Sequence, residues 1–89
     1  MQRFELSIFG RVQGVLFRQS VRRHGEKLGL AGWVRNEDDG SVRVLVEGEP
    51  AALEEFTRWC REGPPLARVD RIAVEEKEAT NEFTDFRIL

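Results

Sequence analysis

The fold is decided by one stretch in the middle of the chain, Gly32-Trp33-Val34-Arg35-Asn36-Glu37-Asp38-Asp39-Gly40-Ser41-Val42-Arg43-Val44-Leu45-Val46-Glu47. From Ser41 to Glu47, apolar and polar side chains alternate, which is the period of a strand with one buried face. Asp39-Gly40 lies between two strand patterns, and Asp-Gly favours a hairpin because glycine adopts positive φ at no steric cost. The stretch therefore predicts a β-hairpin.

A helix is predicted on each side of this hairpin. The first begins at Phe17, carries Val21 and Leu28 on one helical stripe, and stops near Gly29, a residue that suits a left-handed helix end. The second begins at Pro50, whose missing N–H does no harm there, and ends before Gly63. Two helices separated by a hairpin pack most simply on one face of an antiparallel sheet.

Outer strands complete this plan. Residues 4–8 alternate as a first strand. Residues 69–74 are predicted to form a fourth strand, and the alternation slips by one residue between Val69 and Ile72, as at a β-bulge. Residues 75–82 are charged and are predicted to be an exposed connection, and residues 83–89 form a short fifth strand. The order β-α-β-β-α-β plus a fifth strand predicts an α+β ferredoxin-like sandwich, with residues 1–89 as a single domain.

Composition excludes several classes of protein. The 89 residues are 40% hydrophobic and 34% charged, a globular balance. A net charge of −2 argues against strong nucleic-acid binding, which needs a basic surface. One cysteine cannot form an internal disulfide and fits a reducing compartment. With no signal peptide and no apolar run near the roughly 18 residues of a membrane helix, we expect a free-standing cytoplasmic monomer with no membrane partner.

The segment between the first strand and the first helix carries the chemistry, and it reads Gly10-Arg11-Val12-Gln13-Gly14-Val15-Leu16-Phe17-Arg18. The first turn of a helix has N–H groups without partners and a partial positive charge, so it suits a phosphate. Gly14 lets successive N–H groups turn inward as an anion nest, and Arg18 adds a planar fork that matches two phosphate oxygens. An ordinary loop with a solvated arginine is an equally good interpretation of these residues alone.

Gly10 to Arg18 resembles the phosphate-binding signature of the acylphosphatase family, G-x-V-Q-G-V-x-F-R. A second family signature is similar to Leu28-Gly29-Leu30-Ala31-Gly32-Trp33-Val34-Arg35-Asn36, followed by Asp39-Gly40, in the family's order and spacing. The resemblance covers essentially the whole chain. Gly25 departs from it, since family members often have alanine there, but this position touches no catalytic group.

The resemblance implies an enzyme that hydrolyses small-molecule acyl phosphates to a carboxylate and inorganic phosphate. It implies that Arg18 holds the phosphoryl group together with the backbone of the phosphate-binding loop, and that Asn36 positions the attacking water. The loop comprises Gln13, Gly14, Val15, Leu16, Phe17 and Arg18. No metal, cofactor or covalent phosphoenzyme is implied. Inorganic phosphate is expected to act as product and as competitive inhibitor at the same site.

Other residues fit structural roles better than chemical ones. His24 and Cys60 lie on the apolar stripes of the two helices and are predicted to be partly buried and core residues, respectively. One cysteine and one histidine cannot supply a usual zinc ligand set. The acidic residues 37–39 could attract a cation, but such residues are normal in a hairpin turn. A non-catalytic anion-binding or regulatory module on the same fold is the alternative function.

Overall fold

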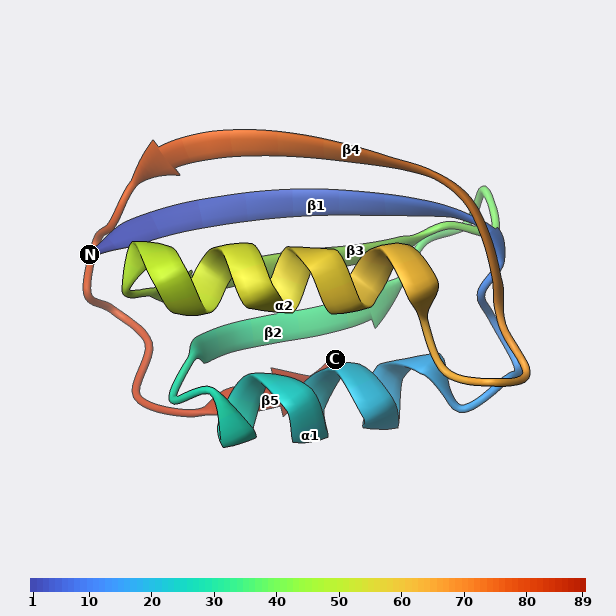
Figure 1. Ribbon diagram of the computed structural model, residues 1–89, viewed down its shortest axis with the longest axis horizontal. Coiled ribbons are helices and arrows are strands. Elements are labelled where there is room, and N and C mark those ends of the chain that lie inside the picture. The colour runs from blue at the N-terminus through green and yellow to red at the C-terminus, as the bar shows by residue number, and fades with distance from the viewer.

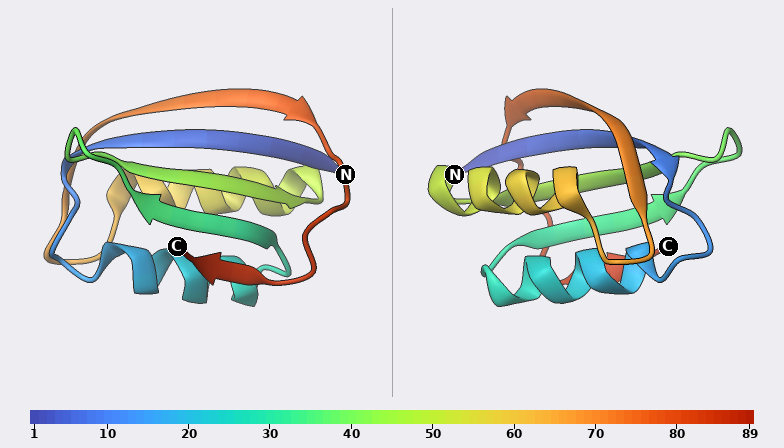
Figure 2. Two further views of the ribbon diagram at one scale, coloured as in Figure 1. Left: turned by 180° about the vertical axis from the view of Figure 1, so that it is seen from behind. Right: turned by 45° about the vertical axis from the view of Figure 1, so that its right-hand side comes forward.

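The computed structural model describes residues 1–89, and its elements follow the predicted order (Figure 1). The strands and helices, in chain order, are β1 (Gln2–Arg11), α1 (Phe17–Lys27), β2 (Ala31–Asn36), β3 (Val42–Gly48), α2 (Pro50–Glu62), β4 (Arg68–Glu78) and β5 (Phe86–Ile88). The five strands form one sheet in the order β4-β1-β3-β2-β5. Both helices cover the same face of that sheet (Figure 2). The prediction of a ferredoxin-like sandwich is confirmed.

One strand pairing makes the sheet mixed, whereas the sequence predicted an antiparallel sheet. Strand β5 pairs with β2 in parallel, with Gly32 opposite Phe86, while the other three pairings are antiparallel. Strand β4 ends at the end of the sheet where β2 begins, because Glu78 and Gly48 both pair with Gln2. The segment 79–85 crosses that end of the sheet (Figure 2), so the chain enters β5 in the direction of β2.

Strand β4 is longer than predicted. The prediction of an exposed connection is wrong for residues 75–78, which continue the pairing with β1 as far as Glu78 opposite Gln2. Their side chains are exposed on an edge strand, so no apolar alternation marks them. The predicted irregularity in this strand is confirmed, because the register shifts between Phe9 and Gly10 and leaves Asp70 as the extra residue.

The core lies between the sheet and the two helices. It is formed by apolar residues that the alternation and the helical stripes predicted, among them Phe4, Leu6, Ile8, Val21, Val34, Val44, Leu53, Phe56 and Cys60. Gly25 of α1 faces Phe86 of β5, and a Cβ added at Gly25 would lie 2.4 Å from the Phe86 ring. The departure from alanine at Gly25 therefore allows β5 and α1 to pack closely.

The polar features of the molecule gather at two opposite ends of the sheet. At one end lie the end of β1, the segment 12–16, the start of α1 and the β2–β3 turn (Figure 1). At the other end lie the start of β1 and the crossing segment 79–85 (Figure 2). No helix of the protein has the length and apolar character needed to cross a membrane.

Candidate active site

The segment between β1 and α1 is held in a conformation that leaves its N–H groups free. Gly14 and Leu16 both have positive φ, 73° and 63°, with Val15 between them in the ordinary region. Buried side chains anchor the segment on either side, Val12 at 1% exposure and Phe17 at 1%. The first hydrogen bond of the helix runs from Ser20 N to Leu16 O, so the N–H groups from Gly14 to Gln19 donate to no backbone carbonyl. This alternation between positive and negative φ along residues 14–16 is the backbone geometry of an anion nest.

Arg18 lies in the first turn of α1, directly beside these N–H groups. Its side chain is half-buried, and it makes no ion pair with a carboxylate. The first turn of α1 contains no acidic residue. No carboxylate of the protein therefore pairs with Arg18, and the partial positive charge of the helix N-terminus lies beside it.

Asn36 reaches the same pocket from the last position of β2. The pocket has a volume of about 230 Å³ and is lined by Val12, Gly14, Leu16, Phe17, Arg18, Gln19 and Asn36. The Oδ1 atom of Asn36 is buried and has no hydrogen-bond partner. Most buried polar atoms are paired in folded proteins, so an unpaired acceptor beside a free arginine indicates a place for a ligand or a water.

Gln13 makes a contact that the sequence did not reveal. Its side-chain Nε2 donates hydrogen bonds to Glu37 O at 2.8 Å and to Ser41 O at 2.9 Å. These carbonyls belong to the β2–β3 turn, and Glu37 directly follows Asn36. Gln13 thus joins the loop that carries Arg18 to the strand that carries Asn36. Its partners lie 24 and 28 residues away, so no local pattern could have identified them.

The predicted site residues divide into two groups in the structure. The members that line the pocket are Gly14, Leu16, Phe17, Arg18 and Asn36. Gln13 and Val15 do not line it; the Gln13 side chain bonds to the β2–β3 turn, and Val15 packs in the core. Val12 and Gln19 also line the pocket but were not among the predicted site residues. Val12 belongs to the signature from Gly10 to Arg18, and Gln19 directly follows that signature.

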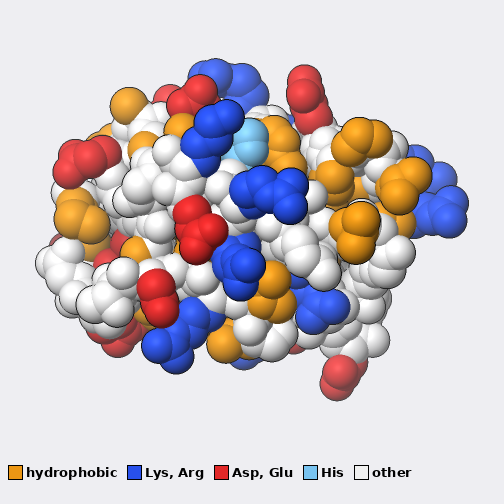
Figure 3. All heavy atoms as spheres, turned by 90° about the horizontal axis from the view of Figure 1, so that it is seen from below, with side chains coloured by type: hydrophobic (Ala, Val, Ile, Leu, Met, Phe, Trp, Pro, Cys, Tyr) orange, Lys and Arg blue, Asp and Glu red, His pale blue; other side chains and the backbone are white.

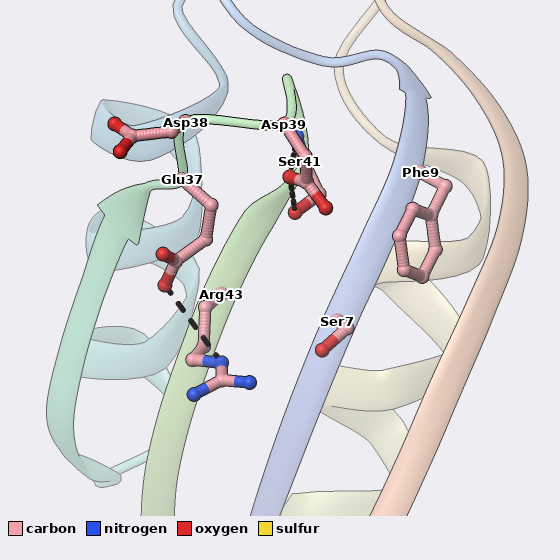
Figure 4. A pocket seen from close by; sticks show the side chains of 7 residues that line it. All are labelled: Ser7, Phe9, Glu37, Asp38, Asp39, Ser41 and Arg43. Carbon is pink, nitrogen blue, oxygen red and sulfur yellow. Dashed lines mark hydrogen bonds and ion pairs between the residues drawn. The ribbon is translucent and has the colours of Figure 1, made fainter.

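A larger pocket, on the face of the sheet away from the helices, is unsuited to an anion (Figure 4). It has a volume of about 350 Å³ and includes the three consecutive acidic residues 37–39. Its one cation, Arg43, is already shared between Glu5 at 3.5 Å and Glu37 at 3.8 Å. Hydrogen bonds from the Ser41 hydroxyl and N–H lower the pKa of Asp39, so this carboxyl stays ionised at neutral pH.

His24 and Cys60 lie away from the candidate pocket. His24 is half-buried and stacks on Trp59 with ring centroids 4.5 Å apart, and burial, followed by the charge of Lys27, lowers its pKa. Cys60 is fully buried, which raises the pKa of its thiol and keeps it protonated. The predictions of a partly buried histidine and a core cysteine are confirmed. Nowhere do three or more His, Cys, Asp or Glu side chains gather in a way that could hold a metal ion.

The fold places this protein among the ferredoxin-like α+β sandwiches, and its first strand and first helix are joined by a loop with free N–H groups. The acylphosphatase family model matches residues 4–88, and the chain belongs to the acylphosphatase family. It is 49% identical over 87 residues to an acylphosphatase of Marinobacter nauticus, covering 98% of this chain and 95% of that one. It is 47% identical over 89 residues to an acylphosphatase of Methylococcus capsulatus, covering 100% and 97% of the two chains.

A solved structure supports the same assignment. Acylphosphatase from Bacillus subtilis superposes with a TM-score of 0.97 at 39% identity, covering 100% of this chain and 99% of that one. The resemblance stated from the two sequence signatures is therefore confirmed. The protein is an enzyme of the hydrolase class, an acylphosphatase.

Proposed function

We propose that the protein hydrolyses acyl phosphates in the pocket that contains Arg18 and Asn36. The observation that carries this proposal is the buried, unpaired Oδ1 of Asn36 in the pocket that also contains an arginine without an ion pair. One group needs a hydrogen-bond donor and the other needs an anion. A water and a phosphoryl group together satisfy both.

The phosphoryl group is held by the loop backbone and by Arg18. The N–H groups from Gly14 to Gln19 make no hydrogen bond to a backbone carbonyl and can donate to phosphoryl oxygens. The Arg18 guanidinium donates two parallel charge-assisted hydrogen bonds, a geometry that lysine cannot reproduce. These donors are in place before substrate arrives, so they stabilise the charge of the transition state without reorganisation.

Asn36 orients the water that attacks phosphorus. Its amide oxygen accepts a hydrogen bond from the water, but a neutral amide is too weak a base to remove a proton fully. The water oxygen forms the new bond to phosphorus while the bond from phosphorus to the acyl oxygen breaks. The carboxylate leaves with the electron pair and needs no proton, and the protons of the attacking water pass to phosphate or solvent. No strong general acid is required, so His24 and Cys60 need not take part.

The side chain of Gln13 keeps the two halves of this site in register. Arg18 follows β1 and Asn36 ends β2, so a shift between these elements would separate the phosphoryl group from the water. The two hydrogen bonds from Gln13 to the β2–β3 turn oppose that shift. Gln13 is therefore a positioning residue in this mechanism rather than a catalytic one.

The proposal requires no metal, cofactor, nucleic acid or membrane, because Arg18 and the backbone N–H groups supply the positive charge. A single chain provides every group named, so a monomer suffices. Hydrolysis should therefore persist after exhaustive treatment with a chelator. Loss of turnover on chelation, restored by a divalent cation, would contradict the metal-independent mechanism.

The decisive experiment compares two arginines one helical turn apart. Arg18→Ala should reduce turnover of acetyl phosphate by about 10³-fold or more and weaken inhibition by inorganic phosphate. Arg22→Ala is the matched control, because Arg22 is exposed on the same helix and does not line the pocket. Both variants are checked for folding by circular dichroism. Wild-type turnover in a folded Arg18→Ala protein, or phosphate inhibition that substrate cannot relieve, would favour a non-catalytic anion-binding module or a different site.

A further inference from the structure

Leu16 has an unusual conformation for its residue type. Its φ and ψ angles are 63° and 23°, in the left-handed region that Gly and Asn adopt far more readily than Leu. Its neighbours Val15 and Phe17 are buried at 7% and 1% exposure, whereas Leu16 is 64% exposed. An apolar side chain is thus held in solvent by a backbone conformation that would suit a glycine better. Backbone strain of this kind is concentrated at functional sites.

The exposed Leu16 side chain belongs to the candidate active site. Leu16 lines the same pocket as Arg18 and Asn36. A second exposed apolar residue, Leu66 at 68% exposure, lies in the segment between α2 and β4. This segment runs beside the start of α1, because a Cβ added at Gly63 would lie 3.0 Å from the Phe17 ring. Figure 3 shows apolar side chains gathered at this end of the molecule, with basic side chains beside them.

A substrate of this enzyme has two chemically different halves. The phosphoryl group is an anion and is recognised by the N–H groups and Arg18, whereas the acyl group differs from one acyl phosphate to another and needs a separate contact. A pocket of about 230 Å³ that is open to solvent leaves the acyl group near its rim. Apolar surface at that rim gains free energy when an apolar acyl group covers it.

We propose that the Leu16 side chain contacts the acyl group and makes the enzyme selective for acyl phosphates with large apolar acyl groups. This inference rests on the proposed function, because it assumes that the phosphoryl group is bound by the loop and Arg18. The backbone of Leu16 then serves the phosphoryl group, and its side chain serves the acyl group. The substrate class is an aromatic or long aliphatic acyl phosphate, in preference to acetyl phosphate.

The test is the ratio of kcat/KM for benzoyl phosphate to that for acetyl phosphate. Both substrates use the same phosphoryl site, so the ratio cancels any effect of a substitution on that site. Leu16→Asn keeps a residue that tolerates the left-handed conformation but replaces the apolar surface with an amide, and Leu16→Gly removes the side chain altogether. Each should lower the benzoyl-to-acetyl ratio on the order of 10-fold, the range expected for loss of an apolar contact in a binding pocket.

Two further variants complete the design. Leu16→Met, which keeps an apolar side chain of similar volume, should retain the wild-type ratio. Leu89→Asn changes another exposed leucine, 57% exposed and outside the pocket, and should leave the ratio unchanged. The proposal would be overturned by an unchanged benzoyl-to-acetyl ratio in both Leu16→Asn and Leu16→Gly, whether kcat/KM stays at the wild-type value or falls equally for the two substrates.

The proposed function is tested separately from this specificity. Arg18→Ala lowers turnover of both substrates by about 10³-fold or more if the phosphoryl site is assigned correctly, whatever the role of Leu16. If Arg18→Ala remains active on both substrates, the proposed function fails. If turnover depends on Arg18 but the benzoyl-to-acetyl ratio is unchanged in the Leu16 variants, only the inference about the acyl group fails.

Discussion

The two ends of the β2–β3 hairpin each bury a polar side-chain oxygen, and the two oxygens differ in their hydrogen bonds. At the end near the crossing segment, the Glu47 carboxylate is 2% exposed and accepts hydrogen bonds from Arg3 Nε at 2.8 Å, Thr80 N at 2.8 Å and Asn81 N at 3.0 Å. At the other end, the buried Oδ1 of Asn36 accepts none. Asn36 follows Val34 on the helix-covered face of the sheet, whereas Glu47 lies on the opposite face, where the segment 79–85 supplies two of its partners.

The difference separates a stabilising network from a binding site. Burial alone would raise the pKa of Glu47, but the N–H groups of Thr80 and Asn81 and the Arg3 guanidinium outweigh it and lower that pKa. Glu47 thereby ties the segment 79–85 to the sheet. An unpaired buried acceptor such as Asn36 Oδ1 costs roughly 1–3 kcal/mol, and that cost is recovered only when a water or a ligand is bound.

Of the two ends of the hairpin, the end with Asn36 should show the larger effect on turnover. Asn36→Ala should reduce kcat on the order of 10²–10³-fold, because it removes the group that orients the water. Phosphate affinity should stay close to wild type, and the free energy of unfolding should not fall, because Oδ1 has no protein partner to lose. Steady-state kinetics, phosphate inhibition and denaturant titration measure the three quantities. Lost phosphate binding with an unchanged kcat at saturation would show that Asn36 holds the phosphoryl group instead.

Glu47→Ala should have the opposite profile. The substitution leaves Arg3 and the N–H groups of Thr80 and Asn81 without their shared acceptor, so the free energy of unfolding should fall by about 3 kcal/mol. Turnover of the folded protein should be preserved, because Glu47 lies at the far end of the hairpin from Asn36. Urea titration gives the stability, and kinetics at low temperature give the turnover. A Glu47→Ala variant with wild-type stability and impaired turnover would contradict the assignment of Glu47 to stability and Asn36 to turnover.

Glu47 should also make the stability of the fold depend on pH in the acid range. The pKa of Glu47 is lower in the folded protein than in the unfolded chain, so its contribution is complete above the ordinary glutamate pKa of about 4.3. That contribution is lost progressively as pH falls from there through the lower folded-state pKa. Glu47→Gln cannot titrate, so its stability should fall less steeply over this acid range than that of the wild type. Equal slopes would assign the acid sensitivity to other carboxylates.

Gln13 tests whether the two halves of the site need to be tied together. Gln13→Met keeps the length of the side chain and removes both hydrogen bonds to the β2–β3 turn. We expect kcat to fall on the order of 10-fold with little change in phosphate affinity, because the water and the phosphoryl group lose their alignment. The comparison variant is Gln19→Met, which changes a glutamine that lines the pocket but makes no such bond. A larger loss in phosphate affinity than in kcat would make Gln13 a binding residue.

The smallest effect is expected at Gly14, and Gly29 provides a close control. Both have the same backbone φ within a degree, 73° and 74°, and a Cβ added at either would meet nothing within 4 Å. Gly14→Ala and Gly29→Ala should therefore each destabilise the fold by about 1 kcal/mol through strain alone. Only Gly14→Ala should also weaken phosphate inhibition. Equal phosphate affinity in the two variants would show that the backbone conformation at Gly14 does not contribute to phosphate binding.

The sequence by itself determined the elements and the residue types of the site. Alternation in residues 4–8 and 41–47, the stripes of the two helices and the turn glycines are local patterns, and local patterns report which face of an element is buried. The two signatures named Arg18 and Asn36 and the loop between β1 and α1. The positive φ of Gly14 is likewise a local property, which a glycine at that place in the loop indicated.

Tertiary structure decided what depends on partners distant in the chain. The extension of β4 to Glu78 follows from its pairing with β1. The parallel pairing of β5 and the burial of Glu47 follow from the path of residues 79–85 across the end of the sheet. The hydrogen bonds of Gln13 and the missing partner of Asn36 likewise exist only once the β2–β3 turn lies beside the loop after β1. Backbone pairing and hydrogen bonding across such separations leave no periodicity in the sequence, because neither depends on which residues are neighbours along the chain.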